Sequence, residues 1–139
     1  METKAVFYIL KSIDLKARNI CACRLIDKAY QAGKRVYVYV ETPEEAEQLN
    51  TQLWTFSDIS FVPHEVSVQG INAPIAIGWE EPSPGFEVLM NLTSRIPFFF
   101  ATFNHIIEIV PDINEIKIKS REKYKNYQGQ NIKLETHEV

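Results

Sequence analysis

Glycine is scarce in this chain of 139 residues, which contains only five of them. Neither G-x-G-x-x-G nor G-x-x-x-x-G-K-[S/T] occurs. The segment KSIDLKARN, which follows the first hydrophobic run, holds no glycine that would let a backbone approach a phosphate. These absences argue against a dinucleotide or nucleoside triphosphate site, so we expect no nucleotide and no other cofactor.

Cysteine and long apolar runs are also sparse. The two cysteines, Cys21 and Cys23, point to different sides of a helical pattern and have no neighbours at metal-ligand spacing. We expect reduced thiols, one of them facing the core, and no metal site. No apolar stretch reaches the roughly 20 residues of a membrane span, and no signal segment opens the chain. The sequence therefore predicts a soluble, cytoplasmic protein without membrane contact.

No recognisable catalytic constellation is present either. The three histidines are His64, His105 and His137, and none of them stands in a known spacing with a nucleophile. His64 follows Pro63 on an expected loop and is the best candidate for a base, although a lone loop histidine more often packs or forms a hydrogen bond. The residues alone therefore indicate no active site.

The hydrophobic runs that are present alternate between strand and helix patterns. Apolar, β-favouring runs predict strands at residues 4–10, 35–40, 74–79, 88–92 and 105–110. Apolar residues at helical spacing predict long helices at residues 19–32, 42–54 and 113–128. Pro97 allows one further short helix. This alternation predicts an α/β fold in one domain, residues 1–129, with a mostly parallel sheet flanked by helices. Residues 130–139 are expected to form a polar C-terminal tail.

The ends of the long helices carry their own signals. Asn19 is the expected N-cap of the first helix, and Gly33 the residue just past its end. Thr42 is expected to open the second helix, and Gly129 to close the third.

Charge is distributed unevenly along the chain, whose net charge is −3. Between Ile116 and Leu134, six Lys or Arg residues stand against one Glu, which leaves nine basic and seventeen acidic residues elsewhere. The net negative charge argues against wrapping in nucleic acid. Positive charge is nevertheless concentrated in one segment, EIKIKSREKYKNYQ, at residues 115–128.

Helical spacing divides this segment into distinct faces. At about 100° per residue, one sector of about 100° contains Lys117, Arg121, Tyr124, Lys125 and Gln128. We call these five residues the basic face. The adjoining stripe, expected toward the core, consists of Ile113, Ile116, Ser120 and Tyr127. Lys119 and Lys123 point elsewhere and are expected to be solubilising.

The basic face has two interpretations. It is either a solvated helix surface whose lysines favour the C-terminal dipole, or an anion site in which Arg121 grips a carboxylate or phosphate bidentately. In an anion site Lys117 and Lys125 would add positive field, and the Tyr124 ring would form an apolar wall. Single-stranded nucleic acid would need several stacking aromatic side chains, whereas an acidic peptide with a terminal aromatic residue needs one apolar slot beside a few cations. One tyrosine in an acidic protein favours the peptide.

Short motifs spread along the chain carry a family resemblance. They are FYIL, CRLIDKAYQAGKRVYV, LWTF followed by SFVPH, LMNL, FFFATFNHIIEIV, and REKYKNY with a later L-x-x-H. In this order and spacing the chain resembles the chi subunit family of bacterial DNA polymerase III over nearly its full length. The resemblance implies a non-enzymatic adaptor that pairs with the psi subunit of the clamp loader and binds the acidic C-terminal tail of single-stranded DNA-binding protein. It also implies a Rossmann-like sheet without a working nucleotide site, and contact with DNA only through partners.

The resemblance assigns roles to the basic face. It implies that Arg121 and Lys125 meet the acidic side chains and the terminal carboxylate of the tail. Tyr124 and Val110 would border the slot for the terminal phenylalanine, with Lys117 and Val110 as lesser contributors. Family members often carry Arg where Lys123 and Gln128 stand here, so a weaker local positive field is expected.

A second surface is implied near the middle of the chain. Trp54, Phe61, Pro63 and His64 match a family segment associated with psi and with alternative helicase partners. The alternative is that these aromatic residues belong to the core. A competing function is direct binding of single-stranded nucleic acid, with the basic C-terminal helix and with Trp54 and Phe61 as stacking platforms.

Overall fold

The computed structural model describes residues 3–55, 64–66 and 73–139. The helices, in chain order, are α1 (Leu15–Gln31), α2 (Pro43–Thr55), the short 3₁₀ helix η1 (Phe100–Thr102) and α3 (Asn114–Gly129). The strands are β1 (Lys4–Ile9), β2 (Val36–Tyr39), β3 (His64–Val66), β4 (Ile75–Gly78), β5 (Val88–Asn91), β6 (His105–Val110) and β7 (Lys133–Glu138).

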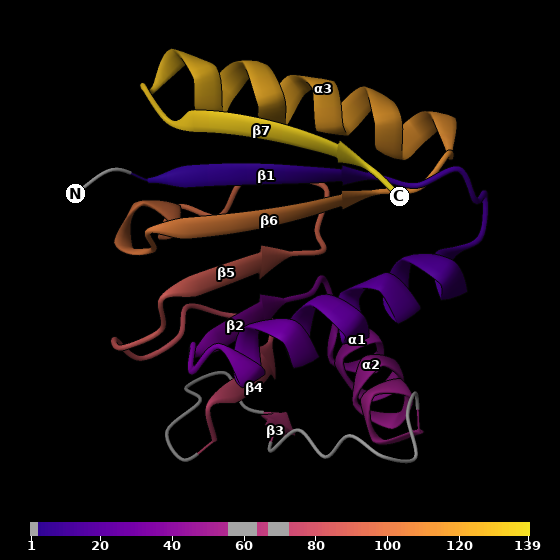
Figure 1. Cartoon of the computed structure of the whole chain (residues 1–139), viewed down its shortest axis with the longest axis vertical. Coiled ribbons are helices and arrows are strands. Elements are labelled where there is room, and N and C mark those ends of the chain that lie inside the picture. The colour runs from indigo at the N-terminus through magenta and orange to yellow at the C-terminus, as the bar shows by residue number, and fades with distance from the viewer. Residues whose placement is uncertain (1–2, 56–63, 67–72) are drawn as a thin grey trace.

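The described strands form one sheet in the order β3-β4-β2-β5-β6-β1-β7, and all its pairs are parallel (Figure 1). The helix α1 carries the chain from β1 across to β2, and β5 and β6 later fill the two positions between them. The α/β fold with a parallel sheet, predicted from the alternation of patterns, is confirmed.

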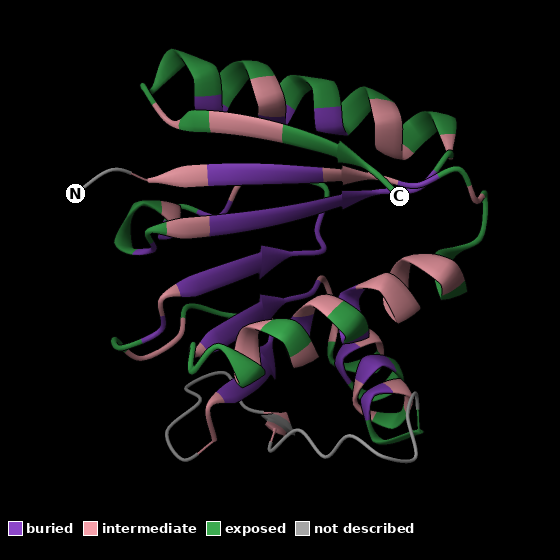
Figure 2. Cartoon of the chain, in the orientation of Figure 1, coloured by how far each residue is buried: buried purple, intermediate pink, exposed green. Residues whose placement is uncertain are grey.

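Two apolar layers hold the helices on opposite faces of the sheet. Buried residues of α1 and α2, among them Ile26 and Leu49, share one core cluster, whereas Tyr127 of α3 belongs to the other. Every residue of β2, β4 and β5 is buried (Figure 2). A parallel strand covered on both faces needs a continuous apolar run, which is why these strands could be found from the sequence.

The first helix begins earlier than predicted. Its N-cap is Asp14, whose carboxylate accepts a hydrogen bond from the N–H of Lys16 at 2.9 Å. The prediction of Asn19 as N-cap is wrong, because Asn19 lies inside α1 and donates its amide to Gln52 of α2 at 2.8 Å. The first turn of α1 contains only one large apolar residue, Leu15, which is exposed, so the regular apolar spacing begins later, at Ile20. Gly33 does follow the helix, with φ 77°, as predicted.

The expected polar tail over residues 130–139 instead contains β7, which pairs in parallel with β1. Gly129 lies within α3, and the left-handed residue in the turn that follows is Asn131, with φ 61°. As an outer strand, β7 is largely exposed, which explains why its residues are polar. None of the helices in the described residues combines the length and hydrophobicity that a membrane crossing requires.

Candidate functional site

The helix α3, which carries the basic face, lies beside β7 at one end of the sheet (Figure 1). On one flank of the helix Lys123 reaches the carbonyl of Thr93, which follows β5. On the other flank Tyr124 packs on Phe7 of β1, with 5.4 Å between ring centroids. Because the rest of the basic face continues around the helix from Tyr124, it turns away from β5 and toward β7 and solvent.

An apolar wall borders the basic face. Tyr124 is half-buried, and it packs against the same core cluster as the partly buried residues Ile116 and Leu134. Val110 ends β6 and is only 4% exposed. It therefore lies behind the wall as a core residue and offers little surface of its own.

The cations of the basic face differ in their partners. Lys117 Nζ lies 2.9 Å from Asp112 Oδ1, and both side chains are substantially exposed. Arg121, Lys125 and Gln128 are exposed. Within the described part of the chain neither Arg121 nor Lys125 forms a salt bridge with another residue. Both cations are thus available to an anion from outside the molecule.

The expectation that Lys123 is a solubilising residue is wrong. Its side chain is buried, and its ammonium donates to Glu108 Oε1 and to the carbonyl of Thr93, each at 2.7 Å. The other carboxylate oxygen of Glu108 accepts from Asn91 Nδ2 and from the hydroxyl of Tyr127, each at 2.9 Å. Lys119, by contrast, is exposed as expected and lies 3.7 Å from Glu122.

This buried network joins α3 to the middle of the sheet. Burial raises the pKa of Glu108, while the Lys123 ammonium and three hydrogen bonds oppose that shift. Burial and the neighbouring Glu108 carboxylate raise the pKa of Tyr127, so its hydroxyl stays protonated and keeps donating. A buried ion pair with both partners satisfied favours one position of the helix over others, which fixes the direction of the basic face.

The sequence contains a signal for this network that the helical spacing of α3 alone does not reveal. Glu108 interrupts the otherwise apolar strand pattern HIIEIV, where a charge must be paired if it is buried. Lys123 falls on the same helix sector as Ile116 and Tyr127. A charge inside a buried strand and an opposite charge on a core-facing helix stripe together indicate an internal pair.

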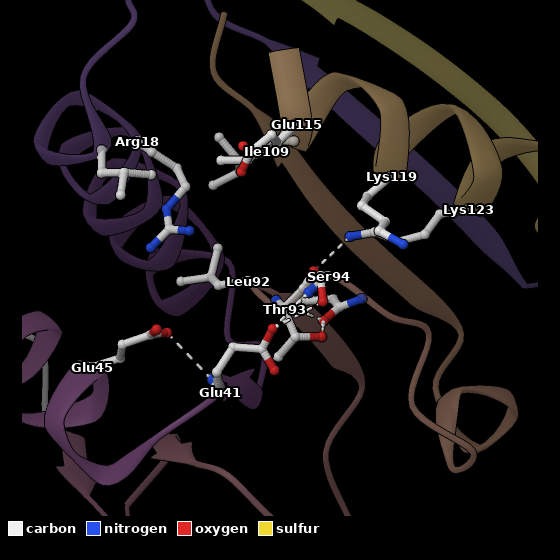
Figure 3. A pocket seen from close by; sticks show the side chains of 13 residues that line it. Arg18, Glu41, Glu45, Leu92, Thr93, Ser94, Ile109, Glu115, Lys119 and Lys123 are labelled. Carbon is white, nitrogen blue, oxygen red and sulfur yellow. Dashed lines mark hydrogen bonds between the residues drawn. The ribbon is translucent and has the colours of Figure 1, made fainter. Parts of the chain in front are cut away.

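A cavity of about 460 Å³ lies on the opposite flank of α3 (Figure 3). Arg18 of α1 and Lys119 of α3 lie on opposite sides of it, and Glu41, which follows β2, lies between them. Glu41 is engaged by Arg95, 2.6 Å away, and by Ser94. The cavity occupies the carboxyl edge of the strands, where such folds often bind ligands. Its lining mixes both signs of charge, whereas the basic face carries one sign.

The second predicted surface is described in part. Trp54, near the end of α2, is 52% exposed, and its ring lies 4.6 Å from that of His64. The interpretation of Trp54 as a core residue is therefore wrong. His64 begins the strand β3 and does not lie on the predicted loop. Phe61 and Pro63 fall outside the described residues.

Comparison with known proteins identifies relatives along the whole chain. Residues 2–135 match the model of the family described as "DNA polymerase III chi subunit, HolC". The DNA polymerase III subunit chi of Pseudomonas aeruginosa is 34% identical over 139 residues, which cover 99% of this chain and 97% of that protein. The subunit chi of Haemophilus influenzae is 33% identical, over 100% and 99% of the two chains. That of Escherichia coli is 30% identical, over 95% of each.

Proposed function

Because the chain belongs to the family of DNA polymerase III chi subunits, which are accessory subunits in DNA replication, we propose a bridging role for it. It joins the psi subunit of the clamp loader to the acidic C-terminal tail of single-stranded DNA-binding protein, by binding and without catalysis. Tail binding uses Arg121, Tyr124 and Lys125, supported by Lys117 and, from behind the apolar wall, by Val110. The region of Trp54 and His64, with Phe61 and Pro63, contacts psi or a helicase.

The observation that carries tail binding is the pair of exposed, unengaged cations beside a half-buried aromatic ring. Arg121 and Lys125 are exposed, and Tyr124 packs on Phe7 between them and the sheet. An exposed cation is fully hydrated, so it gains little from a single carboxylate, but several acids on one peptide act together. The half-buried Tyr124 ring adds apolar contact for an aromatic peptide terminus.

The test is a fluorescence-anisotropy titration with a labelled acidic peptide that ends in phenylalanine. Arg121→Ala and Lys125→Glu should each weaken binding at least about tenfold, because charge-assisted hydrogen bonds contribute about 1.5–3 kcal/mol. Lys119→Glu is the matched control, since it makes the same charge change on the opposite flank of α3. It should leave the affinity within about fivefold of the wild type, because Lys119 lies outside the proposed site and an exposed single charge acting at a distance contributes about 1 kcal/mol or less. Equal losses for Lys119→Glu and Lys125→Glu would show that only net charge matters and would overturn the site.

Ionic strength provides a second check on the same complex. The cations are exposed, so added salt should screen them, with a screening length of about 8 Å under physiological conditions. Affinity for the peptide should therefore fall steadily as salt rises, and a salt-independent complex would contradict the mechanism.

Direct binding of single-stranded DNA is the competing function. It requires stacking rings and cations along one groove. Trp54 belongs to α2 beside β3, and the basic face lies beside β7, so these features sit at opposite ends of the described sheet. We therefore expect no tight binding of a bare oligonucleotide by the isolated chain, and micromolar or tighter binding would favour the competing function.

A further inference from the structure

The outermost strand β7 leaves one side of its backbone open. In the described sheet β1 is its only neighbour. The N–H of Lys133 donates to the carbonyl of Thr3, just before β1, at 3.1 Å, and the N–H of Val139, just after β7, donates to Ile9 O at 2.9 Å. Odd-numbered residues of β7 therefore direct their backbone groups toward β1, and even-numbered residues direct theirs outward.

The outward amides belong to Leu134, Thr136 and Glu138. Leu134 is half-buried, and Thr136 and Glu138 are exposed residues. β7 has six residues and contains no proline, whereas the strand at the other end of the sheet, β3, has three. A long edge without proline is a ready template for another extended chain.

The cations of the basic face are spaced to match such a chain. Lys117, Arg121 and Lys125 follow one another at four-residue intervals along α3, which corresponds to about 6 Å per step. In an extended peptide every second side chain points to the same face, at intervals of about 6.6 to 6.8 Å. Three acids at alternate positions of a strand could therefore each meet one of the three cations.

We propose that an acidic peptide binds in extended form as an eighth strand, hydrogen-bonded to the open edge of β7 and covered by the basic face. This inference rests on the proposed function, because the occupant is the same acidic tail. It adds the backbone pairing and the requirement that the acids alternate. Leu134, whose side chain packs into the core cluster on the α3 side, shows that this face of β7 is the one below α3.

Charge favours the peptide over a second copy of this chain. Two β7 edges paired about a twofold axis perpendicular to the sheet would bring two α3 helices to the same face. Their basic faces, each with Lys117, Arg121 and Lys125, would then confront one another. An acidic peptide meets the same cations with opposite charge.

One variant tests the edge from the protein side. Thr136→Pro removes an outward N–H and places a ring on the open edge, but it leaves the inward hydrogen bonds to β1 in place. It should weaken peptide binding at least about fivefold, the loss expected for one backbone hydrogen bond. Thr136→Ala, which keeps the N–H, should bind within about twofold of the wild type. Thermal unfolding of both variants, followed by circular dichroism, checks that the fold survives.

A scan from the peptide side does not depend on any protein variant. Successive residues of the acidic peptide are N-methylated singly, and each peptide is titrated against the wild-type chain. Strand pairing predicts that affinity falls at every second position, because alternate amides face β7. Moving the acids from alternate to consecutive positions, at constant charge, should also weaken binding.

The outcomes separate this inference from the proposed function. If Arg121→Ala weakens binding while Thr136→Pro binds like Thr136→Ala and the N-methyl scan shows no alternation, the edge pairing is overturned and tail binding stands. If Arg121→Ala has no effect and the scan shows no alternation, both are overturned. A dimer in sedimentation velocity that Thr136→Pro dissociates would assign the edge to a second copy and would also overturn the inference.

Discussion

Asp112 holds one of the three cations that face the proposed ligand. Its carboxylate lies 2.9 Å from Lys117 Nζ. The side chain of Asp112 is 48% exposed and that of Lys117 39% exposed, so both charges are hydrated and their attraction is weak. An incoming acidic peptide must displace Asp112 from Lys117, and it also meets the negative charge of Asp112. This residue therefore limits affinity for the ligand that the basic face favours.

Neutralising that carboxylate should strengthen binding. Asp112→Asn keeps the backbone hydrogen bond from the N–H of residue 112 to Ser12 O, and it should raise affinity for the acidic peptide about two- to fivefold at low salt. The gain should shrink at high salt, because it comes from exposed charges. Glu122→Gln is the control, since it also neutralises one exposed acid, but one within α3 that lies near Lys119 and not near Lys117. An equal gain for both variants in the anisotropy titration would assign the effect to net charge and contradict a specific role of Asp112.

Residue-level prediction from the sequence succeeded where periodicity alone decides the outcome. The sector of Lys117, Arg121 and Tyr124 follows from the geometry of a helix, and the structure places these residues on one side of α3. Lys123 was mispredicted because a lysine can be buried only with a partner, and its partner Glu108 is 15 residues away in sequence and on another element. Val110, by contrast, belongs to the apolar run of β6, whose two-sided burial makes it a core residue.

At the scale of elements, the buried pair of Lys123 and Glu108 attaches α3 to β6. Lys123→Met should leave the Glu108 carboxylate buried without its cation and reduce the free energy of unfolding by about 3–5 kcal/mol near pH 7. Urea denaturation measures this loss. Combining Lys123→Met with Glu108→Leu should recover part of it, because an apolar pair of similar size needs no compensating charge.

The cost of the unpaired carboxylate should depend on pH in a defined direction. Burial already raises the pKa of Glu108, and loss of the Lys123 ammonium removes the charge that opposes this shift. A carboxyl group whose pKa is higher in the folded state binds more protons there, so its penalty disappears below the unfolded value of about 4.3 and grows as pH rises through the folded pKa. The deficit of Lys123→Met relative to the wild type should therefore shrink from pH 7 to pH 5. A constant deficit would mean that lost packing, and not the charge, causes the destabilisation.

Elements, like residues, could be predicted where a local sequence pattern reflects their burial. The buried strands β2, β4, β5 and β6 were found because two-sided burial demands an apolar run. The outer strand β7 was predicted as a tail, because pairing on one edge and exposure to solvent leave its composition polar. The start of α1 was missed for a related reason, since the single large apolar residue of its first turn, Leu15, is exposed and forms no repeating pattern.

The whole molecule separates its two proposed surfaces. The described sheet has seven strands, so its ends, β3 and β7, lie six strand spacings apart, or about 29 Å at roughly 4.8 Å per spacing. Trp54 and His64 belong to the β3 end, and the basic face belongs to the β7 end. A rigid parallel sheet between them lets each surface bind its partner without displacing the other.

This separation predicts a ternary complex with independent losses. In sedimentation velocity the chain, psi and a labelled acidic peptide should form one species, and the affinity for the peptide should be the same within about twofold with and without psi. Trp54→Ala should weaken psi binding at least about tenfold, as for a central aromatic side chain of an interface, and should leave peptide binding intact. Arg121→Ala should weaken peptide binding and leave psi binding intact.

Phe98→Ala is the matched control, because Phe98 is the most exposed aromatic residue described, at 79%, and belongs to neither surface. If Trp54→Ala and Arg121→Ala each abolished binding of both partners, the two surfaces would be coupled through the sheet and could not act as independent ends of a bridge.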